Sequence, residues 1–499
     1  MGIEIKSDRV FTRQQVENLL NAALHKTLLE VDKAKLFEHH AGKTKVTGIA
    51  GDIVEISILG CSRNSDQEPD LTVDGVPVEL KTTGMIEPKK DTGLKYECKE
   101  PVSITAVSIQ TIVDEEFETS KFWHKLAHML WVYYHYNSQK TVTLEAYKTF
   151  PIIGFQFYEF SEEDKLRLKE DWLVVRDFLI VIHREYTTQS ERDAQYPRLS
   201  SELRGKLLLI DTAPKFPHSP RFRLKRSFAT LIASQYFQKR DLEKLPKPIT
   251  KYSDIDDKCK QLTAKYRGKP FPEIAEELGA ELITKKGTLI KNFAELVVVK
   301  MFGSNAKKLN DIEDFAKIGL IAKSLPLGVN GQPKESMKMF APDFDEWVSE
   351  ESFEESFLRS YFAENQFLLI VYQYTHPNPQ NKDPRYIIFK EFKRVVLPDD
   401  FIENQVEPFW NEVRSLIKND KLKIIQECRK DGTPIINRVS GTRREAPNFP
   451  KEKDHDVFLR GSATTAGESS KTLIINGIKM LPQEVWLSKR FTNSLITSN

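Results

Sequence analysis

The sequence predicts an α/β protein built from two tandem domains of related sequence. Three observations support this: the 499 residues exceed one core of ordinary size, helical and strand patterns alternate, and motifs of the first half recur in the second. We expect a first domain at 1–238, a linker at 239–254 and a second domain at 255–499. The linker combines charged residues with Pro246 and Pro248, which is typical of a connection between domains.

The composition is that of a globular protein, with 40% hydrophobic and 29% charged residues. No apolar run approaches the roughly 20 residues that span a bilayer, and the N-terminus lacks an apolar signal region, so we expect a cytoplasmic protein with no membrane contact. The net charge of +2 excludes a polybasic, indiscriminate nucleic-acid binder but allows a site-specific one with a local basic cleft. The four cysteines lie far apart without a CxxC pair, which predicts reduced thiols and no zinc site.

The first half begins with helical patterns. Residues 11–31 carry apolar positions at helical spacing behind Thr12, which can act as the N-cap, and a second helix is expected at 48–60. A turn at Asp74-Gly75 then opens into residues 76–82, which alternate between polar and apolar as a half-buried strand does.

Further along, Thr119-Ser120 is expected to cap a helix that contains Lys125, and residues 130–134 follow as the next strand. The order of helix, hairpin, helix and strand is that of an α/β domain.

The second half repeats the first in a degenerate form. Five segment pairs recur in the same order and at similar spacing: FAELVVVKMFG (293–303) with IAGDIVEISILG (49–60), 314–327 with 70–82, FLLIVYQY (367–374) with MLWVYYHY (129–136), 410–417 with 171–179, and 486–496 with 223–232. A diverged tandem duplication explains this order. The alternative is that both halves share only a generic α/β pattern.

The chemistry-bearing group of the first half is Pro69-Asp70 followed by Glu79-Leu80-Lys81. Alternation along a strand places Glu79 and Lys81 on one face and Leu80 on the other, toward the core. The intervening turn would bring Asp70 alongside, forming a carboxylate pair for a hard divalent cation. Mg²⁺ is commonly held by one or two carboxylates plus waters and a substrate phosphate. Lys81 would orient or deprotonate the attacking water, whose pKa the metal lowers.

The Glu-x-Lys spacing is not specific by itself. It recurs at Glu4/Lys6, Glu87/Lys89, Glu97/Lys99, Glu163/Lys165 and Glu391/Lys393, which we interpret as solvated surface charges. Only Glu79/Lys81 lies between apolar strand residues with a Pro-Asp upstream of a turn.

The motifs GIAGDIVEISILG, PDLTVDGVPVELKT, ETSKFWHKLAHMLW, EEDKLRLKEDW and RLKRSFATLIAS resemble the MutH family in content and order. With its degenerate C-terminal copy, the chain is similar to the two-domain Sau-type restriction endonucleases that cut GATC. The resemblance implies two tandem PD-(D/E)xK nuclease domains, each with a mixed central sheet flanked by helices. It also implies Mg²⁺ as the cofactor and double-stranded DNA as the partner.

The resemblance further implies the roles of individual residues. The implied catalytic residues are Asp70, Glu79, Lys81, the supporting acid Glu55 and the further lysine Lys125. Asp70, Glu79 and Leu80 are the implied metal-binding residues. The residues expected to contact DNA are Lys206, Lys215, Arg221 and Arg223 around the family's base-reading loop, and Arg443, Arg444 and Arg460 in the second half. Arg223 stands where the family has a tyrosine before its Leu-Lys-Lys.

In the second copy, the repeat places Lys323 opposite Lys81 and Asp314 opposite Asp70, but Ile321 opposite Glu79 and Val298 opposite Glu55. Because an isoleucine cannot ligate magnesium, this half is expected to be catalytically inactive while still able to bind DNA.

The sequence thus predicts a type II restriction endonuclease whose C-terminal domain binds a second DNA site as an effector. We expect that it can form a homodimer on DNA and that a cognate methyltransferase belongs to the same system. Two alternatives remain open. A methylation-directed nickase of mismatch repair is disfavoured by the second domain, and a non-catalytic DNA-binding regulator is disfavoured by the intact Asp70, Glu79 and Lys81.

Overall fold

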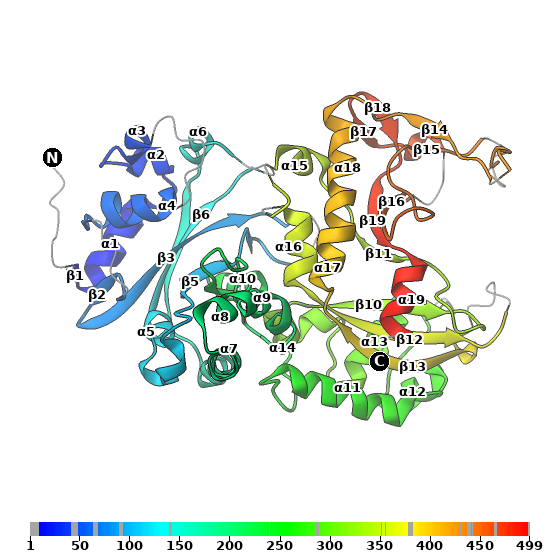
Figure 1. The fold of residues 1–499 in the computed structure, drawn as a ribbon, viewed down its shortest axis with the longest axis horizontal. Helices are drawn as coiled ribbons and strands as arrows, with labels where there is room; N and C mark the ends of the chain where they lie inside the picture. Colours follow the sequence, from blue (N-terminus) through cyan, green and yellow to red (C-terminus); the bar gives the residue numbers. More distant parts are fainter. Residues whose placement is uncertain are drawn as a thin grey trace. The chain divides into compact units, whose positions relative to one another are not determined.

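The computed structural model describes residues 9–40, 48–62, 68–88, 93–138, 142–238, 240–285, 289–350, 352–354, 356–377, 383–429, 431–436, 441, 443–463 and 467–497. The chain forms two compact units (Figure 1). Unit 1 comprises Met1–Ser138, Val142–Lys258 and Phe302–Leu320, and unit 2 comprises Gln139–Thr141, Cys259–Met301 and Ile321–Asn499. Residues 239–254, where the sequence suggests a linker, pack within unit 1, and so does the segment Phe302–Leu320 from the expected second domain.

The main sheet of unit 1 is mixed, as predicted for an α/β domain. It has six strands with the order β1-β2-β3-β6-β7, and β4 pairs with the far end of β3. The strands are β1 (Val10–Phe11), β2 (Leu71–Val73), β3 (Val76–Ile86), β4 (Glu97–Cys98), β6 (Met129–His135) and β7 (Ile152–Tyr158). The β1–β2 and β3–β6 pairs are parallel, and the others are antiparallel.

A second, antiparallel sheet of unit 1 has the order β5-β9-β8. Its strands are β5 (Val102–Ala106), β8 (Ile210–Asp211) and β9 (Arg221–Leu224). The helices of this unit are α1 (Arg13–Ala23), α2 (Leu28–Val31), α3 (Leu36–His39), α4 (Ile49–Asp52), α5 (Lys121–Leu126), α6 (Leu144–Tyr147), α7 (Glu162–Glu185), α8 (Gln189–Gln195), α9 (Arg198–Leu203), α10 (Arg226–Phe237) and α14 (Glu313–Ile318). Helix α11 (Tyr252–Tyr266) begins in unit 1 and ends in unit 2.

The first expected helix is divided in two. Thr12 caps α1 as predicted, but α1 ends at Ala23 and α2 begins only at Leu28. Between them His25 has a φ of 63°, and its N–H donates to the carbonyl of Ile152 instead of continuing the helix. A tertiary hydrogen bond to the sheet therefore interrupts a segment whose apolar spacing alone suggests one helix.

The second expected helix, at 48–60, begins as α4 and continues as the π-helix η1 (Ile53–Ile58). The segment is helical as predicted, but its wider second part shifts the angular positions of its side chains. Single π-turns of this kind are frequent near functional sites.

The mixed sheet is covered on both faces, as Figure 1 shows. On one face, Leu80 of β3 and Leu130 of β6 pack with Val16 of α1 and Ile53 of η1 in a single apolar core. On the other face Tyr133 contacts Phe237 of α10, with ring centroids 5.2 Å apart. The alternation along β3 thus separates Leu80, in the core, from its neighbours on the opposite face.

Unit 2 contains two three-stranded sheets, with the orders β10-β12-β13 and β11-β19-β16. Their strands are β10 (Leu320–Leu327), β12 (Gln366–Tyr374), β13 (Ile387–Val395), β11 (Met337–Phe340), β16 (Val457–Gly461) and β19 (Gln483–Leu487). Two ribbons of two strands each complete the unit: β14 (Ile424–Gln426) with β15 (Glu445–Pro447), and β17 (Leu473–Ile475) with β18 (Ile478–Met480).

The helices of unit 2 include α12 (Phe271–Leu278), α13 (Phe293–Met301), α15 (Phe344–Ser349), α16 (Phe357–Glu364), α18 (Glu407–Lys418) and α19 (Lys489–Thr497). Trp347 and Trp410, from α15 and α18, are buried at the centre of its core. Among the described residues, no helix is both long and apolar enough to cross a membrane.

Candidate active site

The hairpin of β2 and β3 brings the two expected metal-binding carboxylates together. Its two-residue turn, Asp74-Gly75, has φ values of 49° and 81°, the left-handed geometry that hairpin turns of this length favour. The register pairs Leu71 with Val78, so Asp70, one residue before β2, lies opposite Glu79. The Asp70 Oδ2 atom accepts a hydrogen bond from the backbone N–H of Leu80 at 3.0 Å. The turn therefore sets the position of Asp70 beside the Glu-x-Lys segment, as the sequence predicts.

Glu79 is the centre of a buried charge cluster. Its side chain is only 1% exposed and accepts from Lys81 Nζ at 2.6 Å and from Lys125 Nζ at 2.9 Å. Lys125 lies in α5, just before β6, and the parallel pairing of β3 with β6 brings it to Glu79. Lys125 Nζ also donates to the carbonyl of Glu68 at 3.2 Å. Two lysines thus face one carboxylate, and a buried carboxylate needs such partners.

Within the site, the pKa of the Asp70 carboxyl is shifted away from its ordinary value. Burial, followed by the negative charge of Glu79, raises the pKa of Asp70 to about 6, against the opposing influence of Lys81 and Lys125. A carboxyl group whose ionisation is opposed by burial and by a neighbouring negative charge is stabilised in its charged form by an additional positive charge.

Glu55 lies on η1 and is connected to the hairpin through an arginine. Arg9 pairs with the Glu55 carboxylate and donates to the backbone carbonyl of Asp70 at 2.8 Å. Glu55 therefore acts on the backbone of Asp70 indirectly, through Arg9. Sequence reasoning did not identify Arg9, because it stands in no motif and reaches the site only through the parallel pairing of β1 with β2.

The donor set at this hairpin fits a hard divalent cation such as Mg²⁺. Asp70 and Glu79 offer carboxylate oxygens, and Leu80, whose side chain has no donor atom, can offer only its backbone carbonyl. Mg²⁺ accepts such a set because it keeps several water ligands and needs only one or two carboxylates. In the described part of the chain, no group of three or more His, Cys, Asp and Glu residues forms an alternative metal cluster.

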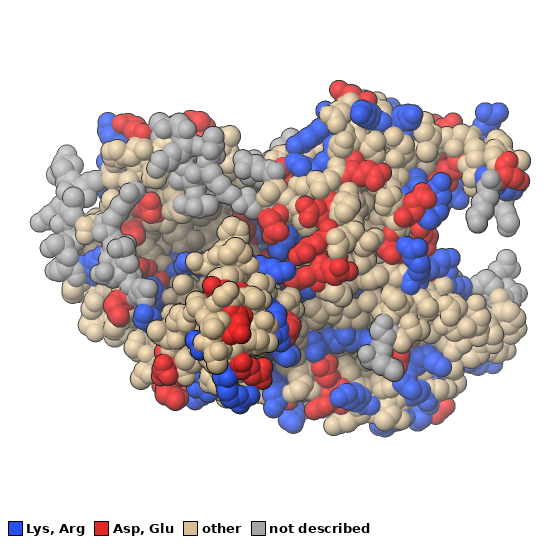
Figure 2. All heavy atoms as spheres, in the orientation of Figure 1, with Lys and Arg blue, Asp and Glu red and all other residues tan. Residues whose placement is uncertain are grey.

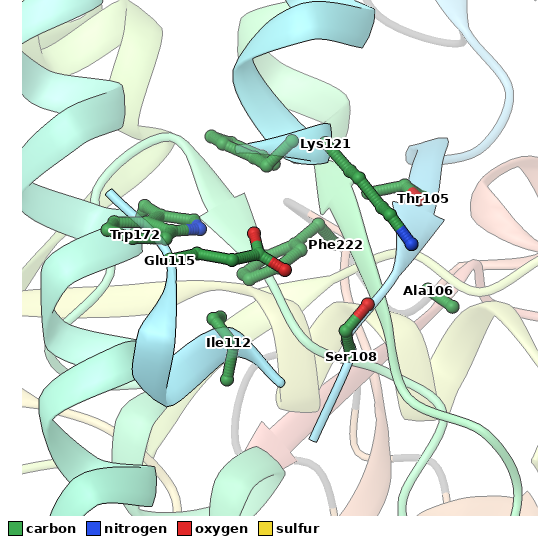
Figure 3. Close-up of a pocket in the computed structure, with 9 residues that line it drawn as sticks. Thr105, Ala106, Ser108, Ile112, Glu115, Lys121, Trp172 and Phe222 are labelled. Carbon is green, nitrogen blue, oxygen red and sulfur yellow. The ribbon is translucent and has the colours of Figure 1, made fainter. Parts of the chain in front are cut away.

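The small pocket shown in Figure 3 is a different feature of unit 1. It is lined by Phe222 of β9, Trp172 of α7 and Lys121 of α5, and by none of the expected catalytic residues. Its volume of about 10 Å³ has room for about one water molecule. It is therefore too small to hold a substrate.

The expected DNA-contacting residues of unit 1 surround β8 and β9. Lys206 and Arg221 are exposed, and Lys215 is half-buried. Arg223 of β9 forms a bidentate ion pair with Asp211 of β8, at 2.7 and 3.0 Å. Its guanidinium therefore links the two strands.

The expected DNA-contacting residues of unit 2 lie on two different elements. Arg443 and Arg444 are exposed beside β15, and Arg444 pairs with Glu427 at 2.6 Å. Arg460 of β16 lies over the ring of Trp486, 4.9 Å from its centroid, and pairs with Glu452 at 2.7 Å. Over the face that Figure 2 shows, Lys and Arg are interspersed with Asp and Glu, as the small net charge implies.

The second copy differs at the positions that the repeat aligns with the active site. Ile321 packs against the apolar core of unit 2, and Lys323 Nζ donates to the backbone carbonyls of Lys338 and Met339 at 2.9 and 3.0 Å. A cavity of about 280 Å³ adjoins these residues, between β10, β11 and Trp486.

Asp314, aligned with Asp70, is not part of a hairpin. It lies in α14, within unit 1, where it pairs with Arg167 of α7 at 2.5 Å and is 6% exposed. The short alignment between 314–327 and 70–82 therefore does not hold at its first residue, because α14 packs as a helix in a buried ion-pair cluster.

Comparisons with known proteins agree with the resemblance read from the sequence. The family model "DNA mismatch repair enzyme MutH" matches residues 59–171, which contain Asp70, Glu79, Lys81 and Lys125. The chain is also 24% identical over 443 residues to "Type II restriction enzyme Sau3AI" from Staphylococcus aureus, a match that covers 85% of this chain and 84% of that enzyme. The resemblance to MutH and to the Sau-type restriction endonucleases is confirmed by both findings.

Proposed function

We propose that this chain, similar to MutH and to a Sau-type restriction enzyme, is a type II site-specific deoxyribonuclease that hydrolyses phosphodiester bonds in duplex DNA with Mg²⁺. One observation carries the proposal: Asp70 and Glu79 face each other across a hairpin while Lys81 and Lys125 reach the same carboxylate. A nuclease site needs this combination of metal-binding oxygens and cations for a phosphate whose charge increases during the reaction.

In this mechanism Asp70, Glu79 and the Leu80 carbonyl hold the cation, which when bound supplies Lewis acidity and lowers the pKa of a water. Lys81, on the same strand face as Glu79, would orient the attacking water by donating a hydrogen bond to it and would add a positive charge beside the phosphate. Lys125 steadies Glu79 and places a second positive charge where the scissile phosphate would lie. Glu55 acts through Arg9 on the backbone of Asp70, which makes it a positioning residue.

The proposed domain organisation is two tandem copies, at 1–238 and 255–499 with a linker at 239–254. The sheets support it, because β3-β6-β7 and β5-β9-β8 of unit 1 have counterparts of the same order in β10-β12-β13 and β11-β19-β16 of unit 2. Register shifts recur on corresponding pairs: at Tyr133/Tyr134 and Val371/Tyr372, and at Ser103/Thr105 and Lys338/Phe340. Shared irregularities of this kind favour common descent over generic patterning.

We further propose that the C-terminal copy is inactive and binds a second DNA site as an effector. Ile321 stands where the first copy has Glu79 and cannot ligate a metal, while Arg443, Arg444 and Arg460 supply basic side chains on that copy. Lys206, Lys215 and Arg221 would contact DNA on the catalytic copy. The resemblance stated from the motifs leads us to propose a GATC-like site, a homodimer on DNA, a cognate methyltransferase in the same system and a cytoplasmic location.

A plasmid digest tests the proposal. Purified protein with Mg²⁺ should convert a plasmid into discrete linear fragments, and chelation of the metal should abolish cleavage. Sequencing of the fragment ends identifies the site. Nicked circles as the final product would instead favour a repair-type nickase, and intact plasmid with a sequence-specific gel shift would favour a non-catalytic regulator.

A further inference from the structure

Residues 421–449 of unit 2 form an element that we call the β arm. Its stem is the ribbon of β14 and β15, and the described residues between them (427–429, 431–436, 441, 443 and 444) extend away from the rest of the unit (Figure 1, orange). Beyond the stem the backbone stays paired, since Ile435 N–H donates to Glu427 O and Arg444 N–H donates to Ile435 O, both at 2.8 Å. The described part of the β arm is therefore an ordered ribbon.

The described residues of the β arm join the core of unit 2 at its base, and beyond β14 Glu427 pairs with Lys451 at 3.9 Å. Leu422 and Phe449 are 5% and 2% exposed and belong to the core of unit 2, where Phe449 stacks on Phe344. Beyond this base most of the described residues are exposed. Its hydrogen bonds hold the ribbon, but it buries little apolar surface, and a stable fold alone does not account for it.

Charge is concentrated in the β arm. Residues 421–449 contain seven Lys and Arg and three Asp and Glu, a net charge of +4, whereas the whole chain carries +2. Neither Arg429 nor Arg443 has an ion-pair partner among the residues that the structure describes. The surface is thus complementary to a polyanion.

The β arm also exposes large apolar side chains, which a purely electrostatic contact does not require. Ile424, Ile425 and Ile436 are 36%, 37% and 48% exposed. Exposed isoleucines next to arginines match the edges of bases in the major groove, where guanine offers two acceptors to an arginine and thymine offers a methyl group.

We propose that the β arm enters the major groove of duplex DNA and reads guanine and thymine edges in the second recognition site. The inference rests on the proposed effector role of the C-terminal copy and adds the element, the groove and the chemistry of reading. The major groove, about 12 Å wide, admits a two-stranded ribbon and displays the thymine methyl group and both guanine acceptors, which the minor groove does not display. Arg443 and Ile436 would reach bases, and Lys421 and Lys423, at the base of the stem, would contact phosphates.

Cys428 provides a local probe of this contact. It lies on the β arm and is exposed, whereas Cys61, Cys98 and Cys259 are buried. A short duplex that carries the site found at the cut ends should slow modification of Cys428 by a thiol reagent at least about fivefold, because a groove-bound ribbon is shielded on both sides. The measurement uses the full chain with Ca²⁺ in place of Mg²⁺, so it does not depend on cleavage.

Base analogues test which groups are read. Replacing thymine by uracil removes the methyl group, and replacing guanine by 7-deazaguanine removes one acceptor. Each should weaken protection of Cys428 in the wild-type protein. In Ile436→Ser the uracil duplex should have no further effect, and in Arg443→Ala the 7-deazaguanine duplex should have none. Arg443→Ala alone should weaken binding by roughly 5- to 150-fold.

Further variants separate base reading from general attraction. Lys421→Ala should weaken binding to all duplexes alike and reduce the slope of affinity against salt by about one. The ribbon β17–β18 offers matched controls, because Ile474 is 58% exposed and Lys479 is exposed as well. Ile474→Ser and Lys479→Ala should leave protection of Cys428 and the effects of both analogues unchanged.

Three results would overturn the inference. Protection of Cys428 by heparin or duplex RNA as effective as by DNA would mean that the β arm binds polyanions without reading them. Unprotected Cys428 in a protein that binds and cuts DNA would place the β arm away from DNA. Loss of self-association in Ile436→Ser, with protection and analogue effects retained, would make it a protein interface. Failure of the wild-type protein to bind or cut any DNA would contradict the proposed function instead.

Discussion

Glu79 is the residue on which both the structure of the hairpin and the proposed chemistry depend. Its carboxylate is buried between Lys81 and Lys125, so its removal would delete a proposed metal ligand and leave two lysines without their partner. The two effects act in opposite directions on cleavage and on DNA binding. Under the proposed function, cleavage would be lost with the metal, whereas attraction for the DNA phosphate would be preserved or strengthened.

We therefore expect Glu79→Ala to lower the rate of cleavage by about 10³-fold or more, equivalent to about 4 kcal/mol of transition-state stabilisation. Its binding to specific DNA in Ca²⁺ should equal or exceed that of the wild-type protein in a gel shift. Glu163→Ala, which changes an exposed Glu-x-Lys pair on α7, is the matched control and should cut normally. Loss of specific binding in a folded Glu79→Ala protein would contradict the assignment.

Glu350 is a buried acid of unit 2 with a pH-dependent consequence. It is 4% exposed and accepts from the N–H of Phe357 at 2.7 Å and from Trp410 Nε1 at 3.0 Å. Burial is the main cause that raises the pKa of Glu350 to about 7. Between pH 4.5 and 7 the unfolded chain has lost this proton while the folded chain retains it, so the unfolded state binds fewer protons.

The free energy of unfolding contributed by Glu350 should therefore be highest below pH 4.5 and fall as the pH rises toward 7, by about 1–3 kcal/mol. Glu350→Gln cannot titrate and should lack this part of the decline. Urea unfolding of both proteins at several pH values, followed through tryptophan fluorescence, measures the difference. Identical pH profiles would show that Glu350 titrates normally in the folded protein.

At the scale of elements, helix α7 orders the chain that leads into β8. Asp171, in the middle of α7, is 2% exposed and accepts from the backbone N–H groups of Leu208, Leu209 and Ile210 at 2.7, 2.7 and 3.2 Å. One carboxylate thus satisfies three consecutive buried donors. This segment precedes the loop between β8 and β9, so α7 determines where that loop starts.

Asp171→Asn should destabilise unit 1 by about 2–3 kcal/mol, because an amide cannot accept from all three donors and a buried N–H left unpaired is costly. Hydrogen exchange at Leu208–Ile210 should accelerate more than exchange elsewhere in the unit. Asp177→Asn, on the exposed face of the same helix, should have little effect on either measurement. Unchanged exchange at 208–210 would show that α7 does not order this segment.

At the scale of the whole molecule, the proposed enzyme has one active site and an inactive second copy, yet it has two DNA strands to cut. If the second copy binds an effector site, occupancy of that site should favour the state that cleaves. Coupling between two binding sites is commonly 1–3 kcal/mol, or about 5- to 150-fold. If binding to the second copy were not coupled to the active site, it would increase the affinity for DNA but would not increase the rate of cleavage.

We expect plasmids with two recognition sites to be cut faster per site than plasmids with one, by about 5-fold or more. A short uncleavable duplex that carries the site should accelerate cleavage of the one-site plasmid. Arg460→Ala should weaken this stimulation, because Arg460 is a basic residue of the inactive copy. Equal rates on both plasmids at matched site concentration, without any effect of the duplex, would end the effector hypothesis and leave dimerisation or backbone contact as its role.

The sequence by itself determined the parts of this protein whose contacts are local. The β2–β3 hairpin follows from a two-residue Asp-Gly turn and strand alternation, so the places of Asp70, Glu79 and Lys81 could be predicted, as could the N-caps Thr12 and Ser120. These features depend on residues a few positions apart, where backbone geometry leaves few choices.

Only the tertiary structure decided the contacts between distant segments. Lys125 contacts Glu79 and Arg9 contacts Glu55, each across 46 residues of sequence. No local sequence pattern indicates which lysine or arginine makes such a contact. Asp314, interpreted from the repeat as a counterpart of Asp70, pairs instead with Arg167, 147 residues away, because burying α14 required partners for its charges. Sequence periodicity specifies which face of a helix or strand is buried. Which distant residues pack against that face is decided by the tertiary structure of the whole chain.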